Sequence, residues 1–376
     1  MDVINIIKGL PRQLSAYGFS MPLERALREY LDFLVDREDL LARAQYLHDE
    51  IFEKDPRNLT KFRTLEENDG RETGMLFAVM FLARYEGMDA ILAERGIPVT
   101  YKKASLFVYQ ENMRKSKERY GVYGLQGMYK SGMVAFLTPW KFILGRLTFE
   151  MDWFGGPYAV YRNRENGTLT LMAVPGYFYG EDGRRLPQDF DGTSFEPCLQ
   201  EDGKMIRGFV FAEDGNLNMT EVALDAGRYE CILKPGDTSM SVHIPEMGKL
   251  CPELVDEAFS LAEDFFGKYY QQWNYPAYVC SSWLLNKDLS QLLPYESNIM
   301  RFQSRFRIAM SSVNNYSIYW HVFGVQNFVP LSELVPKNGF QQRMLDWVLL
   351  GNTLYNGNGF ILRHPYMCRF DRITET

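Results

Sequence analysis

The first 140 residues follow a helical pattern of apolar and polar positions. Apolar residues recur every three or four positions within residues 23–34, 40–52 and 72–95. The third of these segments also has apolar residues beside its main stripe, which predicts a helix buried nearly all round. Residues 98–120 are expected to form a further helix, since proline is favoured at a first helical position. Residues 1–140 are therefore predicted to form a helical bundle.

Beyond Trp140 the pattern changes to short runs typical of strands, and Asn166-Gly167 between two of them predicts a hairpin. Asp-Gly pairs recur at 182–183, 202–203 and 214–215, each after a glutamate. The further ligands of a calcium loop are missing, so these pairs are expected to be turns. The expected strands are 144–153, 158–162, 169–174, 205–212, 217–224, 229–233 and 239–244.

Helical spacing returns at Pro252 with a wide apolar face of the kind that lies on a sheet. A strand is expected at 275–282, so residues 239–282 are predicted to form a strand–helix–strand unit with parallel strands. The elements expected after it are a helix at 297–306, a hairpin of strands 307–313 and 316–323, a helix at 340–349 and a strand at 360–363. The fold class is therefore α+β, with a helical domain (1–140) followed by a mixed α/β domain (141–376).

Composition adds little beyond a folded protein. The chain has 376 residues, 46% hydrophobic and 24% charged. Its longest apolar run, residues 75–83, is shorter than the roughly 20 residues of a membrane span. The N-terminus has no basic segment before a long apolar stretch, and the five cysteines are scattered without a CxxC pair. We therefore expect a cytoplasmic protein that makes no membrane contact.

Charge and histidine spacing limit the possible partners. Residues 1–140 carry as many basic as acidic side chains, so the net charge of −7 belongs to the remainder. An acidic domain repels phosphate backbones, and a nucleic-acid partner is not expected. The four histidines, His48, His243, His321 and His364, have no zinc-ligand spacing, so no metal site is expected.

The segment from His243 to Pro252 links a predicted strand to a predicted helix. Backbone N–H groups at a helix start attract anions, and Gly248 and Lys249 favour the approach of a phosphate. The acidic first turn, which begins with Glu253, opposes it. From these residues alone, an ordinary connection is the favoured interpretation.

A resemblance changes this balance. Residues 236–306 resemble the C-terminal domain of bacterial acyltransferases that pair a helical N-acyltransferase N-terminal domain with a GNAT-like domain. The matching segments are Gly236-Asp237, His243-Ile244-Pro245, Gly248, Leu250, Phe265-Phe266, Cys280 to Leu285, Ser297-Asn298-Ile299, Phe302 and Phe306.

The resemblance implies acetyl-CoA or another acyl-CoA as donor. In that fold the pantetheine arm enters where two central parallel strands splay apart, and the pyrophosphate sits on the loop into the following helix. The implied cofactor-binding residues are Met247, Gly248, Lys249 and Leu250, together with Ser281, Ser282 and Trp283. The usual loop has the form Arg/Gln-x-x-Gly-x-Gly/Ala, whereas this chain has Gly248 and no second glycine.

His243, at the end of a strand, is the first candidate for catalysis. An imidazole can deprotonate an amine or hydroxyl acceptor, although a hydrogen-bonded core histidine is an equal alternative. Cys280 would lie near it on a neighbouring parallel strand and could form an acyl-enzyme, but inert packing is more common for such a cysteine. Tyr295 is a possible proton donor to the leaving thiolate, a role that tyrosine takes in the GNAT family.

Candidate acceptor contacts are less distinctive. Trp153 and Tyr158 belong to an aromatic cluster that could stack on a sugar, although two cores would use the same rings. Asn298 is a helix-start residue first and a substrate contact second. The leading hypothesis is an acyl-CoA-dependent N- or O-acyltransferase acting on a small acceptor. The alternative is a non-catalytic binding protein with a degenerate GNAT fold, possibly carbohydrate-related. The sequence leaves the acceptor, the acyl chain and the oligomeric state open.

Overall fold

A computed structural model describes residues 1–53, 71–187, 190–325 and 328–363. His364 and one cysteine, Cys368, lie outside the described residues. The chain divides into two compact units, residues 1–144 and 145–376, and each is described by itself.

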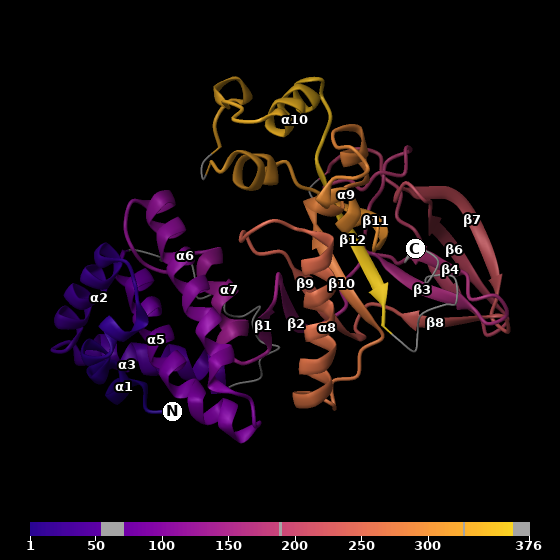
Figure 1. The fold of residues 1–376 in the computed structure, drawn as a ribbon. Coiled ribbons are helices and arrows are strands. Elements are labelled where there is room, and N and C mark those ends of the chain that lie inside the picture. The colour runs from indigo at the N-terminus through magenta and orange to yellow at the C-terminus, as the bar shows by residue number, and fades with distance from the viewer. Residues whose placement is uncertain (54–70, 188–189, 326–327, 364–376) are drawn as a thin grey trace. The chain divides into compact units, whose positions relative to one another are not determined.

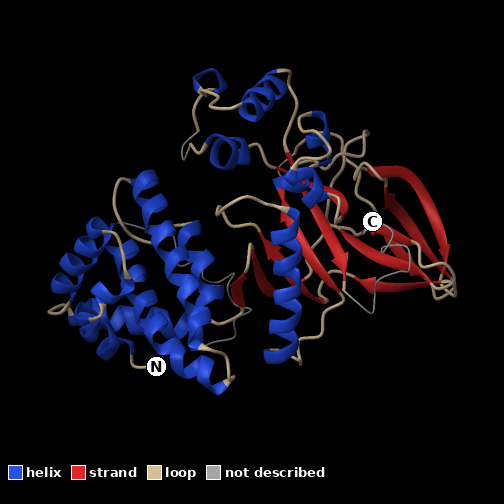
Figure 2. Ribbon diagram, in the orientation of Figure 1, coloured by secondary structure: helices blue, strands red, loops and turns tan. Residues whose placement is uncertain are grey.

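The first unit is helical, as its hydrophobic pattern predicts (Figure 2). Every residue from Met75 to Ala83 is buried, so the long central helix is enclosed nearly all round. No helix within the described residues has both the length and the apolar content needed to cross a membrane. The elements of this unit are α1 (Val3–Gly9), α2 (Met21–Leu34), α3 (Glu38–His48), α5 (Arg71–Glu94), α6 (Lys103–Tyr120), α7 (Met128–Leu137) and a final short strand, β1 (Lys141–Leu144).

The second unit is built on a mixed sheet, and the strand–helix–strand prediction is confirmed. Its strands, in spatial order, are β2 (Leu147–Trp153), β9 (Thr238–His243), β10 (Ala277–Ser282), β12 (Tyr355–Leu362) and β11 (Arg307–Val313). Strands β9 and β10 are parallel, and the other neighbours are antiparallel. The crossover between β9 and β10 is α8 (Pro252–Tyr269), drawn in front of these strands in Figure 1. Phe259 of α8 packs on Phe149 and Tyr278, so the helix covers one face of the sheet.

A second, antiparallel sheet is inserted between β2 and β9. It contains β3 (Tyr158–Asn163), β4 (Leu169–Ala173), β5 (Leu199–Glu201), β6 (Met205–Phe211), β7 (Leu217–Asp225) and β8 (Tyr229–Leu233). Its inner face packs Tyr158, Val160 and Leu233 in one cluster with Val279 and Phe360 of the first sheet. The two sheets therefore share a core on the side opposite α8.

The three Glu-Asp-Gly repeats are turns, as expected. Each aspartate uses its own side chain locally: Oδ1 of Asp182, Asp202 and Asp214 accepts from the backbone N–H two residues later, at 2.9–3.0 Å. Gly203 and Gly215 have positive φ values, which glycine adopts without strain. Turn chemistry thus accounts for much of the acidity of this region.

The strand predicted at 316–323 is wrong. Ile318–Phe323 forms a π-helix, η8, which ends at Gly324 in the left-handed region. Ile318, Val322 and Phe323 face an apolar cluster with α10 (Gly339–Leu349). Burial of three side chains on one helical face overrides the strand preference of these aromatic and β-branched residues.

Phe149→Ala should destabilise the second unit. Phe149 is fully buried, and its ring centroid lies 5.6 Å from that of Phe259 and 5.8 Å from that of Tyr278. Removing this ring is expected to lower the free energy of unfolding by about 3–5 kcal/mol, measured by denaturant titration. Leu261→Ala on α8 is the control, since Leu261 is 40% exposed. A similar loss in both variants would contradict the assignment of Phe149 to the core.

Candidate functional site

The parallel ladder between β9 and β10 ends before either strand does. The register pairs two residues of each strand, Met240 with Tyr278 and Ser241 with Val279. Strand β9 then continues to His243 and β10 continues to Ser282. The last residues of the two parallel strands therefore do not pair with each other.

Each strand nevertheless stays with its outer neighbour. Strand β2 follows β9 to its end, where Thr148 pairs with His243. Strand β12 follows β10 to its end, where Gly357 pairs with Ser282. The sheet therefore parts between β9 and β10, at the carboxyl ends of its parallel strands, which is where open α/β sheets bind ligands.

A polar face lies beside this point. It consists of alternate residues of β2 and β9 that point away from α8: Thr148, Glu150, Asp152, Ser239, Ser241 and His243. Nε2 of His243 lies 2.8 Å from Oε2 of Glu150, and the Ser241 hydroxyl donates to Oδ2 of Asp152 at 3.0 Å. The His243 side chain is 45% exposed. His243 is therefore not a buried core histidine, the alternative that the sequence left open.

Asp152 has an unusual environment for a carboxyl group. Burial is the main cause that raises the pKa of Asp152 above its ordinary value, and the nearby charge of Glu150 raises it further. Hydrogen bonds from the Trp153 N–H and from Ser241 act in the opposite direction. The polar face thus combines a carboxyl group that resists ionisation with a histidine–carboxylate pair.

Cys280 is not brought together with His243. Because Tyr278 pairs with Met240, Cys280 shares the α8 side of the sheet with Tyr278, whereas His243 points to the other side. Cys280 is buried, and burial raises the pKa of its thiol to about 12. These observations do not support an acyl-enzyme on Cys280, because a thiol with this pKa is a poor nucleophile.

The loop after β9 is tied down from two sides. The Arg146 guanidinium donates to the carbonyls of Pro245, Gly248 and Lys249 at 3.0, 3.3 and 3.0 Å. A second contact comes from His321, whose Nδ1 lies 3.1 Å from Oε1 of Glu246 in the loop. Leu250 is buried and anchors the end of the loop. The segment that the resemblance assigns to the donor's phosphates is therefore a fixed part of the structure.

The residues after β10 have mainly structural contacts. The Ser282 hydroxyl accepts from the N–H of Leu284 and caps η6 (Trp283–Leu285). The ring of Trp283 is close to parallel with two others, those of His321 and Phe340, and its centroid lies 6.4 Å from each. Ser281 is exposed. Trp283 is thus a packing anchor, and Ser282 already uses its hydroxyl.

The predicted acceptor residues are dispersed. Tyr158 is fully buried between the sheets, where its hydroxyl donates to the Asn358 carbonyl at 3.4 Å, so it cannot be a stacking platform. Trp153 is at the far end of β2 from His243, five residues or about 17 Å along the strand. Asn298 starts α9 (Asn298–Gln303), and its amide lies 3.9 Å from Sγ of Cys251 before α8.

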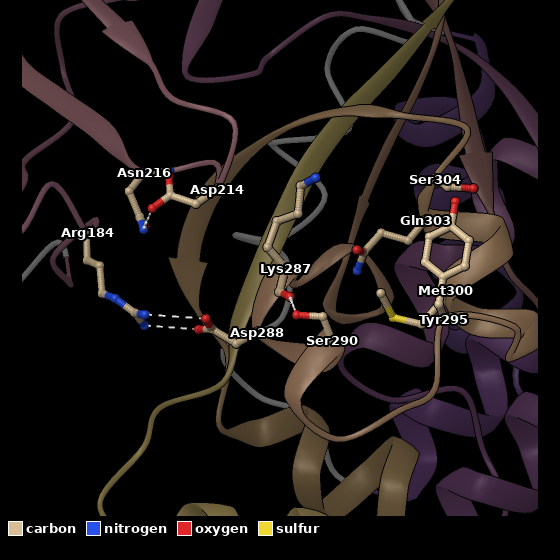
Figure 3. Close-up of a pocket in the computed structure, with 10 residues that line it drawn as sticks. All are labelled: Arg184, Asp214, Asn216, Lys287, Asp288, Ser290, Tyr295, Met300, Gln303 and Ser304. Carbon is tan, nitrogen blue, oxygen red and sulfur yellow. Dashed lines mark hydrogen bonds and ion pairs between the residues drawn. The ribbon is translucent and has the colours of Figure 1, made fainter. Parts of the chain in front are cut away.

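Tyr295 lies at a separate pocket of about 430 Å³ (Figure 3). The pocket is lined by the turn that follows β6 and by the residues after β10, including η7 (Lys287–Gln291) and α9. Arg184 and Asp288 form an ion pair of 3.1 Å at one end, and Asp214 accepts from Asn216. Tyr295 is 72% exposed at the other end.

Lys287 is the distinctive group of this pocket. Nζ of Lys287 makes no hydrogen bond or ion pair with any residue in the part of the chain that the structure describes. Burial lowers the pKa of Lys287, and Arg307 lowers it further. Two cations and two carboxylates line the pocket, so its formal charge is balanced. The described residues contain no cluster of three potential metal ligands.

Glu150, Asp152 and Arg146 were missed by the sequence patterns. Glu150 and Asp152 alternate on a predicted strand, which signals a shared polar face. Their partners on β9 lie about 90 residues later, however, and no local pattern indicates that pairing. Arg146 occupies a turn, where an arginine carries no signal of its own.

Comparison with known proteins identifies the second unit. A family model described as GNAT-like C-terminal domain matches residues 142–361. Comparison with curated proteins gives no match.

Three solved structures of acyltransferases are similar over most of the chain. One, in complex with decanoyl-CoA and teicoplanin, is 19% identical and has a TM-score of 0.57, covering 91% of this chain and 86% of that one. Another, with decanoyl-CoA, is 17% identical with a TM-score of 0.56 and coverages of 93% and 86%. A mutant with octanoyl-CoA is 18% identical with a TM-score of 0.57 and coverages of 96% and 99%. At these identities the likeness shows the fold.

Asp152→Asn should change how stability depends on pH. The raised pKa means that folded Asp152 keeps a proton that the unfolded chain releases above the ordinary pKa of 3.8. Wild-type stability therefore falls as the pH rises from about 4 through the folded pKa, and the variant lacks this fall. Denaturant unfolding between pH 4 and 8 should show the variant gaining stability relative to wild type as the pH rises.

Asp202→Asn is the control with the opposite sign. Backbone hydrogen bonds from Met205 and Lys204 lower the pKa of exposed Asp202. This variant should lose stability relative to wild type as the pH rises up to about 4, and the difference should then stay constant between pH 4 and 8. A difference between Asp152→Asn and wild type that stays constant with pH would contradict the assignment for Asp152.

Proposed function

Because the chain belongs to the GNAT-like C-terminal domain family, we propose that it transfers an acyl group from acyl-CoA to a small amine or hydroxyl acceptor. The observation that carries the proposal is the end of the β9–β10 ladder beside an exposed histidine–carboxylate pair. Acyl-CoA in the similar acyltransferase structures supports the donor, and teicoplanin in one of them supports a separate small-molecule acceptor.

The donor would enter where β9 and β10 part. Backbone N–H and C=O groups on the facing edges, beyond Ser241 and Val279, are the partners for the amide groups of the pantetheine arm. The loop of residues 245–251, with Met247, Gly248, Lys249 and Leu250, would receive the pyrophosphate. Backbone N–H groups near Ser281 to Trp283 would polarise the thioester carbonyl. The N–H of Leu284 is not one of them, since Ser282 already accepts its hydrogen bond.

His243 would act as general base. With Nε2–H donated to the Glu150 carboxylate, the basic lone pair of the neutral ring is on Nδ1. Nδ1 would take the proton of the acceptor as its nitrogen or oxygen attacks the thioester carbon. Glu150 would orient the ring and stabilise the imidazolium that forms. Collapse of the tetrahedral intermediate expels the CoA thiolate, and Tyr295 would supply its proton.

The pocket at Lys287 would hold the acceptor. Its position after the end of β10 is beyond the carboxyl ends of the parallel strands. An acyl chain would fit poorly, because it would desolvate Lys287, Asp214 and the Arg184–Asp288 pair. Balanced charge favours a neutral polar group over a phosphate. The ammonium of Lys287 would donate to an oxygen of the acceptor.

His243→Gln should lower kcat about 100-fold, because a general base contributes at least that factor. Glu150→Gln should lower kcat by a smaller factor, since the ring stays in place but loses the charge that stabilises its protonated form. Thiol release from acetyl-CoA and octanoyl-CoA with a panel of amines and alcohols measures both, and calorimetry with CoA should give unchanged affinity.

Glu165→Gln is the matched control, because Glu165 makes a surface ion pair with Arg228 in the inserted sheet. It should retain wild-type kcat. Wild-type kcat in His243→Gln would remove the general-base role. Absence of CoA binding to the wild-type protein would refute the proposed function as a whole.

Lys287→Met should raise KM for the acceptor about tenfold, the effect of losing one charge-assisted hydrogen bond. KM for the acyl-CoA donor should stay unchanged, because Lys287 lies in the separate pocket and not on the strand ends or the loop assigned to the donor. The assay uses the best acceptor from the thiol-release panel. Lys268→Met, an exposed lysine on α8, serves as control. An increase in KM for the donor alone would contradict the assignment of this pocket to the acceptor.

A further inference from the structure

Arg146 holds the loop after β9 from behind. All three nitrogens of its guanidinium donate to carbonyls of that loop: Nη1 to Pro245, Nη2 to Gly248 and Nε to Lys249, at 3.0, 3.3 and 3.0 Å. The planar fork of arginine allows this; the ammonium of a lysine is a single point and cannot reproduce it. One side chain from outside the loop therefore fixes the orientation of three of its peptide groups.

Arg146 is itself held against α8. It follows Gly145, which adopts φ +60° at a turn before β2. A Cβ added to Gly145 would lie 3.4 Å from the Cα of Ala258 and 3.3 Å from Leu261 of α8. The turn is therefore packed closely on the helix that the loop precedes. Arg146 thereby links the start of β2 to the loop before α8.

The three hydrogen bonds determine where the N–H groups of the loop point. In a planar trans peptide the N–H is directed opposite to the C=O. Because the carbonyls of residues 245, 248 and 249 point to Arg146, the N–H groups of Glu246, Lys249 and Leu250 point away from it. Neither the Lys249 nor the Leu250 N–H donates a hydrogen bond within the described ranges of the chain. Gly248, with φ +63°, makes the turn that aligns the two consecutive carbonyls.

We propose that Arg146 is a positioning residue for the donor: it turns backbone N–H groups of the 245–251 loop toward the pyrophosphate of acyl-CoA without touching the donor. The inference rests on the proposed function and extends it to a residue outside the loop. The loop of this chain has one glycine, whereas the usual GNAT loop has two. The Arg146 guanidinium, on the side opposite the pyrophosphate, orders the loop in a way that its sequence alone does not. Successive N–H groups that face one side of a turn are an established form of anion site.

Arg146→Gln is the direct test, with CoA and pantetheine as the two probes. Pantetheine has the arm of CoA but no phosphates. The variant should bind CoA at least tenfold more weakly by calorimetry, and its affinity for pantetheine, measured by ligand-observed NMR titration, should not change. Arg146→Lys should behave in the same way, since it keeps the charge and loses the fork. Arg164→Gln, at a surface arginine paired with Glu230, should change neither affinity.

The outcomes separate the two proposals. If wild type binds CoA and Arg146→Gln binds it equally well, the role of Arg146 is refuted and the proposed function stands. If the variants weaken CoA and pantetheine by the same factor, Arg146 supports the whole site and not the phosphates, which also refutes the inference. If wild type does not bind CoA at all, both the proposed function and the inference fail. Arg146→Lys gives the same readout should Arg146→Gln fail to fold.

Discussion

The second unit depends on how four neighbouring strands, β2, β9, β10 and β12, pair at their ends. Strands β9 and β10 are joined by a short parallel ladder, yet each remains paired with its outer neighbour, β2 or β12, after that ladder ends. Beyond Ser241 and Val279, the backbone N–H and C=O groups of the two strands do not pair with each other. Under the proposed function, the amide groups of the donor's pantetheine arm would pair with them at the carboxyl ends of the parallel strands.

Three different groups of residues lie in this unit: a polar face, the loop after β9 and the pocket at Lys287. On the face away from α8, Glu150 holds His243, and the pKa of half-buried Asp152 nearby is raised. The loop after β9 presents backbone donors because Arg146 holds its carbonyls on the other side. Beyond β10, a charge-balanced pocket contains Lys287. The proposed base, phosphate site and acceptor site would therefore come from different elements of this unit.

The sequence predicts local elements well and distant pairings poorly. Helical spacing and strand composition identified the parallel unit at 239–282 and the turns at the Asp-Gly pairs, because these signals depend on neighbouring residues. The insertion of a whole sheet between β2 and β9 has no such signal, so Glu150 could not be assigned to His243 in advance. Tyr158 was a candidate stacking platform because it lies in an aromatic-rich segment, but its ring is part of the core between the two sheets. The strand predicted at 316–323 failed for the same reason, since burial in a distant cluster outweighed local preference.

Backbone amide hydrogen exchange with and without acetyl-CoA tests the central claim most directly. The account predicts that acetyl-CoA slows exchange in two segments, residues 241–251 and 279–283, because the donor would take up the backbone groups that the parted ladder leaves on its facing edges. Equal slowing in pantetheine and acetyl-CoA is expected for the strand ends, and slowing by acetyl-CoA alone for the loop. Unchanged exchange in both segments at saturating acetyl-CoA, or slowing confined to other parts of the chain, would contradict the account.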